Sequence, residues 1–191
     1  MSKRILLILA HPDSDSFCAA LAQRYESAAL AAGHQVSRLD LGQLRFDPIL
    51  RGGFRGGQAL EPDLQAAQAA ISAAERLVFV YPYWWGVMPA LLKGFIDRVF
   101  LPGFAFKYQD GSPFPAKLLA GREAQLIVTS DTPAWYNRLV YGRAGLRLMR
   151  AQVLEFCGIR LRKILEIGPV RGSQPKAREY WLNRVGQLAS L

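Results

Sequence analysis

Aromatic side chains crowd into a short segment in the middle of the chain, Tyr81-Pro82-Tyr83-Trp84-Trp85, and Gly86 follows them directly. The segment ends a continuous apolar run, Leu77–Tyr81, which has the pattern of a buried strand. Tyrosine and tryptophan rings at the end of a strand can stack on a flat ligand, while backbone amides meet its polar edge. Gly86 would let the backbone approach such a ligand closely. The alternative interpretation is an aromatic plug or a contact between subunits.

A second set of polar groups lies in the segment Ala10–Phe17, which joins the apolar run Ile5–Leu9 to a helical pattern. It places the imidazole of His11 and the hydroxyl of Ser16 beside a helix N-terminus, where free backbone N–H groups bind phosphate. Neither a G-x-G-x-x-G fingerprint nor a G-x-x-x-x-G-K-[ST] motif occurs in the chain. The alternative interpretation is structural, with Ser16 as the helix N-cap and the neighbouring aspartates shaping a turn.

A third segment, Thr129-Ser130-Asp131-Thr132, follows another apolar run and supplies hydroxyl groups and one carboxylate. Two aromatic residues come next, and the phenol of Tyr136 could donate a hydrogen bond or a proton to a ligand. The alternative is a capped turn that carries surface aromatic residues.

Other kinds of site find little support. Cys18 has no evident histidine and acid partner, which argues against a thiol nucleophile. Two cysteines and two histidines in the whole chain make a metal centre improbable, and no G-x-S-x-G elbow is present. Asp97 and Arg98 look like an ordinary pair on a helix.

Composition indicates one globular domain over residues 1–191, with 51% hydrophobic and 20% charged residues. We expect a cytoplasmic protein, because the apolar run after Met1–Arg4 is too short for a secretory signal. The net charge of +9 is uneven: residues 1–95 carry 9 basic and 8 acidic side chains, and residues 96–191 carry 15 and 7. A solvated basic face explains this asymmetry as well as a phosphate or membrane partner does. We expect no nucleic-acid binding, because no recognition motif accompanies the charge.

Strand and helix patterns alternate along the chain, which predicts an α/β fold with a parallel sheet covered on both faces. In such sheets ligands bind beyond the carboxyl ends of the strands, where the three segments above would lie. The predicted strands are 5–9, 35–39, 77–81, 124–129 and 162–167; the predicted helices are 17–32, 62–74, a helix opened by Pro89, 142–157 and 174–191; the predicted loops are 41–60 and 102–115.

These residues resemble the NAD(P)H:quinone oxidoreductases of flavodoxin-like fold. The resemblance lies in His11-Pro12 with Ser16-Phe17, and above all in the continuous block Tyr81–Phe100, YPYWWGVMPALLKGFIDRVF. Phe46-Asp47-Pro48 and Glu155-Phe156-Cys157-Gly158 add to it. It covers nearly the whole chain.

The resemblance implies a flavodoxin-like three-layer sandwich whose five-stranded parallel sheet has the order 2-1-3-4-5. It further implies a homodimer with the flavin sites at the interface. Carried onto this chain, it assigns the flavin phosphate to His11, Ser16, Phe17 and Cys18. It assigns the isoalloxazine to Pro82, Tyr83, Trp84, Trp85 and Gly86, its pyrimidine end to Thr129, Ser130, Asp131 and Thr132, and the substrate pocket to Tyr136.

Two positions depart from the family pattern. Cys18 stands where the family often has asparagine, and Asp131 stands where a glycine is common. Asp131 would either accept a hydrogen bond from the flavin or lower its affinity.

The implied activity is two-electron, ping-pong hydride transfer from NAD(P)H to a quinone or a similar acceptor, with a flavin as carrier. The residues leave open FMN against FAD and NADH against NADPH. Some members of this group are ancillary subunits that regulate potassium efflux channels, so a regulatory flavoprotein with a membrane-protein partner is one alternative. A non-catalytic flavin-binding module is another.

Overall fold

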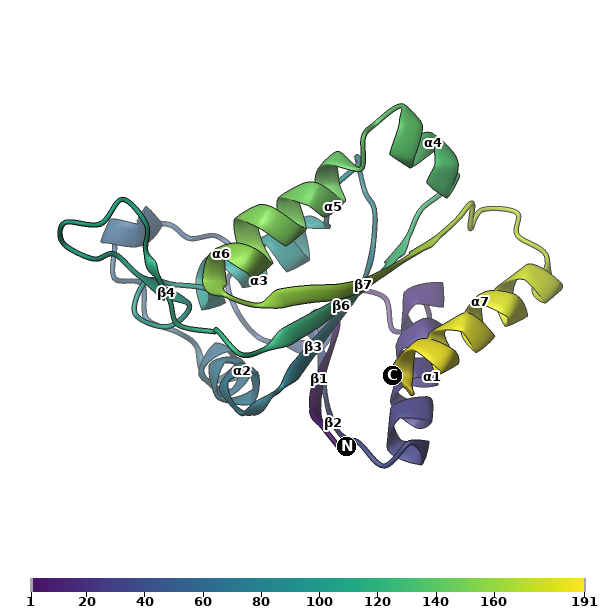
Figure 1. The fold of residues 1–191 in the computed structure, drawn as a ribbon, viewed down its shortest axis with the longest axis horizontal. Helices are drawn as coiled ribbons and strands as arrows, with labels where there is room; N and C mark the ends of the chain where they lie inside the picture. Colours follow the sequence, from purple (N-terminus) through teal and green to yellow (C-terminus); the bar gives the residue numbers. More distant parts are fainter. Residues whose placement is uncertain (1, 191) are drawn as a thin grey trace.

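The computed structural model describes residues 2–190. Its central element is a five-stranded sheet (Figure 1). Every neighbouring pair of its strands is parallel. The spatial order confirms the predicted order 2-1-3-4-5, because the last two strands along the chain lie at one edge. In this order the strands are β2 (Gln35–Asp40), β1 (Arg4–Leu9), β3 (Arg76–Pro82), β6 (Glu123–Thr129) and β7 (Arg160–Ile167).

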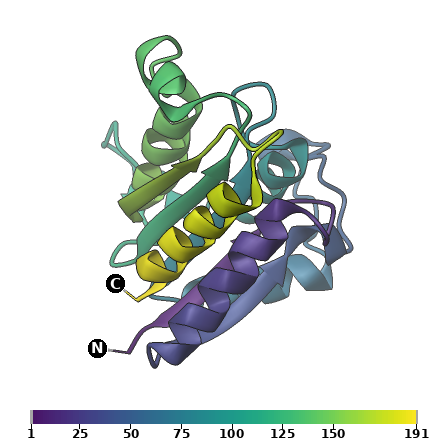
Figure 2. The same ribbon diagram turned by 90° about the vertical axis from the view of Figure 1, so that its right-hand side faces the viewer.

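Helices cover both faces of the sheet, as the alternating pattern predicted. On one face α1 (Phe17–Ala31) and α7 (Pro175–Ala189) lie side by side, although they come from opposite ends of the chain (Figure 2). The other face carries α2 (Pro62–Ala73), α3 (Ala90–Val99), α5 (Ala144–Leu148) and α6 (Glu155–Cys157) (Figure 1). Within residues 2–190, no helix has the length and apolar character needed to cross a membrane.

Burial on both faces explains why the central strands are apolar at every position. In β1, the side chains of Leu6 and Ile8 enter the core beneath α2 and α3, whereas Leu7 and Leu9 enter the core beneath α1 and α7. All of β3 is buried for the same reason. The edge strands β2 and β7 are more exposed, which matches their more polar sequences.

The segment after β6 differs from the sequence-based prediction. A short helix, α4 (Ala134–Leu139), occupies part of what we expected to be a loop. The helix predicted over residues 142–157 begins at Ala144, and a π-helical turn over Met149–Leu154 separates α5 from α6. It ends before Gly158, as predicted, and this glycine has a left-handed φ of 94°. Because α4 exposes most of its apolar side chains, no apolar stripe marked it in the sequence.

The predicted loop over residues 102–115 also contains regular structure. Within it, β4 (Phe106–Lys107) forms a two-residue antiparallel pair with β5 (Ala116–Lys117), which directly follows the predicted loop. Strands this short carry too little alternation to be recognised in a sequence.

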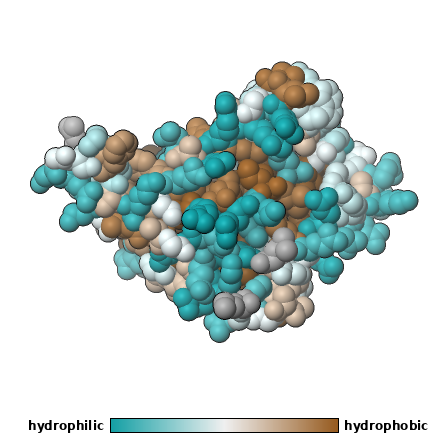
Figure 3. Space-filling model, viewed as in Figure 1, coloured by the Kyte–Doolittle hydropathy of each residue, from teal (hydrophilic) through white to brown (hydrophobic). Residues whose placement is uncertain are grey.

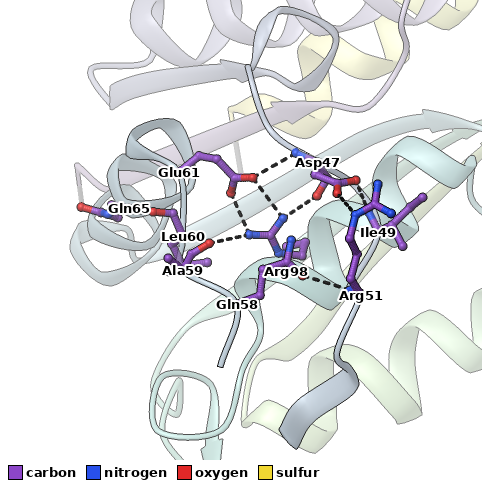
Figure 4. Close-up of polar contacts among 9 residues, drawn as sticks. All are labelled: Asp47, Ile49, Arg51, Gln58, Ala59, Leu60, Glu61, Gln65 and Arg98. Carbon is purple, nitrogen blue, oxygen red and sulfur yellow. Dashed lines mark hydrogen bonds and ion pairs between the residues drawn. The ribbon is translucent and has the colours of Figure 1, made fainter. Parts of the chain in front are cut away.

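Arg98 in α3 holds the long loop before α2 in place, so the predicted pair between Arg98 and Asp97 was wrong (Figure 4). Its guanidinium is fully buried and donates to the backbone oxygens of Asp47 and Ala59, at 2.5 and 2.8 Å. It also pairs with the carboxylate of Glu61 at 2.7 Å. The loop is therefore ordered by a charged group from a neighbouring helix, and Asp97 pairs with Lys93 instead.

Candidate functional site

The three segments that sequence analysis singled out lie together at the carboxyl ends of the strands, because they follow the adjacent parallel strands β1, β3 and β6. A cavity of about 620 Å³ lies there, within the usual range for ligand sites. It is bounded by the segment after β3, the segment after β6, and α4 with the start of α5. Its lining residues are Tyr83, Trp85, Gly86, Val87, Ser130, Asp131, Thr132, Asn137, Tyr141 and Ala144.

The aromatic segment forms a tight turn at the rim of this cavity. The backbones of Trp84 and Val87 exchange two hydrogen bonds of 3.0 and 3.2 Å. Between them Trp85 and Gly86 have φ values of 55° and 77°, the two positive angles that a type I′ turn requires. Such a backbone is costly for tryptophan, and strain of this kind gathers at functional sites. The turn leaves the Trp85 ring fully exposed at the cavity.

The segment after β6 is held by hydrogen bonds to the end of β7 and the loop that follows. The Ser130 N–H donates to the Ile167 carbonyl at 2.9 Å, and the Ser130 hydroxyl donates to the Thr132 carbonyl at 2.8 Å. The Asp131 carboxylate accepts a hydrogen bond from the Arg171 N–H at 2.7 Å. Asp131 therefore ties two loops together, a role that a glycine at this position could not perform.

The segment after β1 contains the helix N-cap and the aspartate turn that its sequence suggested. The hydroxyl of Ser16 caps α1 by accepting from the Ala19 N–H at 3.2 Å, and the carboxylate of Asp13 accepts from the Asp15 N–H at 2.8 Å. The ring of His11 packs edge-on against Trp84 with a centroid distance of 5.6 Å. This contact joins the helix N-terminus to the aromatic turn.

The N-terminus of α1 has a cationic neighbour that sequence analysis did not find. The guanidinium of Arg178, at the start of α7, lies 5.3 Å from the centroid of the Phe17 ring. The first-turn N–H groups of Phe17 and Cys18 point away from the body of α1. An anion at this helix end would meet these N–H groups and the positive charge of Arg178. Helices so far apart in sequence offer no local pattern that pairs them.

Cys18 and Thr129 are buried beneath this helix end, with Sγ and Oγ1 3.2 Å apart. Burial raises the pKa of the Cys18 thiol to about 11, although the hydrogen bond with Thr129 partly offsets the effect. The thiol is therefore protonated at neutral pH, and the two side chains are engaged with each other. Backbone groups remain the means by which these two residues would contact a ligand.

Tyr136, predicted to approach a substrate, is half-buried and lies behind another phenol. Its ring packs edge-on against Tyr141 at a centroid distance of 5.3 Å, and Tyr141 is the tyrosine of α4–α5 that lines the cavity. Sequence analysis missed Tyr141, and it also missed Asn137 and Glu166. The aromatic spacing after Thr132 could have drawn attention to Tyr141, whereas Glu166 lies in a distant strand.

Apolar side chains are exposed on the outer side of the cavity. They surround α4, whose tip carries a hydrophobic surface at the top of the molecule in Figure 3. The exposed apolar residues of α4 and of the turn after it are Trp135, Leu139, Val140 and Tyr141. Large exposed patches of this kind are typical of contacts with another molecule.

No three His, Cys, Asp or Glu side chains between residues 2 and 190 lie close enough together to hold a metal ion.

Comparison with known proteins supports the resemblance found in the sequence. The family described as flavodoxin-like fold matches residues 3–187. An uncharacterised NAD(P)H oxidoreductase of Haemophilus influenzae is 30% identical over 189 residues, covering 95% of this chain and 92% of that protein. The rat NAD(P)H dehydrogenase [quinone] 1 is 27% identical over 96% of this chain and 76% of its own. The crystal structure of Smu.1420 from Streptococcus mutans superimposes with a TM-score of 0.79 at 30% identity, covering 98% of each chain.

Proposed function

The chain belongs to the NAD(P)H:quinone oxidoreductases of flavodoxin-like fold, and from this premise we propose that it is a flavin-dependent enzyme that oxidises NAD(P)H and reduces a quinone-like acceptor. The observation that carries the proposal is the 620 Å³ cavity at the carboxyl ends of β3 and β6. The cavity is lined by the exposed indole of Trp85, by the tight turn at Gly86, and by the hydroxyl-bearing residues Ser130 and Thr132.

The residues of this site fit a flavin. The Trp85 ring offers a stacking surface, and the segment from Ser130 to Thr132 offers hydroxyl and carbonyl groups to the polar edge of a ring system. The Tyr83 ring lines the cavity, and its hydroxyl is buried against the first turn of α5. The N-terminus of α1, with Arg178 beside it, would hold the flavin phosphate.

When bound, the flavin supplies a two-electron carrier that NAD(P)H reduces and an acceptor reoxidises in a ping-pong sequence. The protein groups around it perform the other tasks. Trp85 and Tyr141 present flat faces on which a nicotinamide and then a planar acceptor can stack in turn. The phenol of Tyr141 can donate a hydrogen bond or a proton to an acceptor oxygen, and Tyr136 packs against it and sets its orientation.

We further propose that two copies associate through the apolar surface around α4. Leu139, Val140 and Trp135 are exposed there by 75, 54 and 62%. Burying them against a second copy would remove apolar area from water and exclude water from the cavity opening. This arrangement would place the flavin site at the dimer interface.

The first experiment loads the purified protein with flavin, identifies the bound ligand by absorption spectrum and mass, and follows NADPH oxidation with and without benzoquinone. We expect a bound flavin and quinone-stimulated oxidation with parallel lines in double-reciprocal plots. Trp85→Ala should weaken flavin or acceptor binding by about tenfold through lost stacking. Tyr180→Ala, which removes an exposed ring from α7, is the matched control.

Each outcome separates the alternatives. Loss of all flavin from the wild-type protein, with no turnover, would reject the proposal. Tight flavin binding without NAD(P)H oxidation would instead identify a flavin-binding module. The mass of the released ligand would decide between FMN and FAD.

A further inference from the structure

Glu166, near the carboxyl end of β7, holds two groups of the α4–α5 segment. Its carboxylate accepts a hydrogen bond from Asn137 Nδ2 at 2.8 Å and pairs with the Arg143 guanidinium at 2.6 Å. The Glu166 side chain is only 11% exposed, and Asn137 is buried as well. Figure 1 shows how α4 stands next to the end of β7, where these groups meet.

The backbone at Arg143 is shaped for this ion pair. Gly142 and Arg143 have successive positive φ angles of 56° and 53°, and the Arg143 N–H donates to the Asn137 carbonyl at 2.9 Å. A left-handed backbone is costly for arginine and persists only where the surroundings hold it. Here the strained turn carries the guanidinium back to Glu166.

The ion pair lies beside the flavin cavity proposed above. Asn137 lines that cavity, and Glu166, Asn137 and Tyr83 together line a small adjoining pocket of about 10 Å³. Burial raises the pKa of the Tyr83 phenol, the charge of Glu166 raises it further, and the charge of Arg143 lowers it. Tyr83 also lines the cavity, so the charges of Glu166 and Arg143 both act on a residue of the cavity wall.

We propose that Glu166 and Arg143 shift the reduction potential of the flavin in this cavity in opposite directions, so that losing either charge alone changes the potential. The inference rests on the proposed function. Two-electron reduction adds negative charge to the flavin. A nearby guanidinium therefore favours the reduced form, and a nearby carboxylate disfavours it. In the intact pair the two effects largely cancel, and Glu166 also positions Arg143 and Asn137.

The test compares Glu166→Gln and Arg143→Gln, which break the same ion pair but leave opposite charges behind. The readout is the flavin midpoint potential, measured by spectral titration against a reference dye. Glu166→Gln should favour the reduced flavin over the oxidised flavin by about tenfold, which for a two-electron couple is a rise of about 30 mV. Arg143→Gln should lower the potential by a similar amount. The double variant, which removes both charges, should return close to the wild-type value.

The matched control is Glu155→Gln. Glu155 pairs with Arg150 at 2.7 Å on the same helical segment, but that pair is exposed and neither residue lines the cavity. Its loss should leave the potential unchanged. Melting temperatures of the flavin-free variants measure the structural cost separately, because the potential plays no part in them.

A purely structural role would make both single variants shift in the same direction and would leave the double variant as altered as either one. That result would overturn the inference while leaving the proposed function intact. If Glu166→Gln fails to fold, Arg143→Gln still has to lower the potential and Arg143→Lys, which keeps the charge, still has to preserve it. A wild-type protein that binds no flavin would reject the proposed function itself, and the inference with it.

Discussion

The backbone of Gly145 lies so close to Gly86 that a Cβ at position 145 would overlap the Gly86 carbonyl oxygen. The same Cβ would come within 3.1 Å of the Tyr83 hydroxyl. The first turn of α5 therefore rests directly on the aromatic turn after β3. Because Gly86 and Ala144 both line the cavity, this contact fixes the position of α5 relative to the aromatic turn at the cavity wall.

Gly145→Ala should therefore disturb the flavin site. The added methyl group must push α5 away from the aromatic turn, at a cost of about 1–3 kcal/mol. We expect flavin affinity to fall by about tenfold in a fluorescence titration. The control is Gly186→Ala in α7, where the new Cβ would meet only the flexible end of Arg24 at 3.1 Å. Equal affinities for Gly145→Ala and the wild type would show that the contact does not shape the site.

Much of the fold follows from local sequence patterns. The buried strands are continuous apolar runs because helices cover both faces of the sheet, and Gly33 and Gly158 follow helices with left-handed φ values of 82° and 94°. α4 could not be predicted, since its apolar side chains are exposed and form no buried stripe. Arg98 was misassigned because a helical pattern does not reveal that a distant loop folds over one of its charged residues.

Like the fold, the candidate site has one part that the sequence predicts and another part that it does not. Topology alone brings the segments after β1, β3 and β6 together, so their residues could be proposed from sequence. The contacts of Glu166 with Asn137 and Arg143, and of Arg178 with Phe17, join segments that are far apart in the chain. Only the packing of these segments brings them together, and no spacing rule encodes it. The roles assigned to His11, Ser16 and Tyr136 remain predictions.

Glu61→Gln should destabilise the protein, because it leaves the buried charge of Arg98 without its carboxylate. Removing one partner of a fully buried ion pair costs about 3 kcal/mol; Arg98 is fully buried but Glu61 is 29% exposed, so we expect a loss below this value and above that of an exposed pair. Urea unfolding measures the loss. Asp97→Asn removes the exposed ion pair with Lys93 in the same helix and should cost at most about 0.5 kcal/mol. Similar losses in the two variants would contradict the role assigned to Arg98.

Glu123 should make folding stability depend on acid pH. Burial alone would raise the pKa of its carboxyl, but hydrogen bonds from Lys3 and Arg76 outweigh burial and lower it from the usual 4.5 to about 2. Because the folded-state pKa is the lower one, the stabilisation is fully present above pH 4.5 and disappears as the pH falls towards 2. The difference in unfolding free energy between wild type and Glu123→Gln should shrink over this interval.

The comparison for this pH dependence is Glu75→Gln, since the Glu75 carboxylate is exposed and contacts only Arg4 among the described residues, through the backbone N–H at 3.0 Å and the guanidinium at 3.8 Å. Urea unfolding across the acid range should show a larger change in this difference for Glu123→Gln than for Glu75→Gln. A constant difference for Glu123→Gln would mean that its ion pairs do not contribute to stability.

Leu139→Glu should weaken the proposed dimer. The substitution places a charge in the apolar surface around α4, where burial without a partner is costly. Analytical ultracentrifugation should show dissociation at concentrations where the wild type is dimeric. Leu30→Glu introduces the same change at an exposed leucine of α1, outside this surface, and should leave the oligomeric state unaltered. A wild-type protein that is monomeric at all concentrations would contradict the proposed interface.

Tyr141→Phe should slow the reduction of a quinone acceptor more than Tyr136→Phe does. Tyr141 lines the cavity, whereas Tyr136 reaches it only through the ring of Tyr141. Losing one hydrogen bond to the acceptor should reduce the rate of this half-reaction by about tenfold. Stopped-flow mixing of the reduced enzyme with benzoquinone measures the step directly, and flavin affinity should stay unchanged. Tyr136→Phe serves as the matched comparison because it keeps the ring that packs against Tyr141. A wild-type rate for it would exclude a role for the Tyr136 hydroxyl, and a larger loss than in Tyr141→Phe would reverse the assignment.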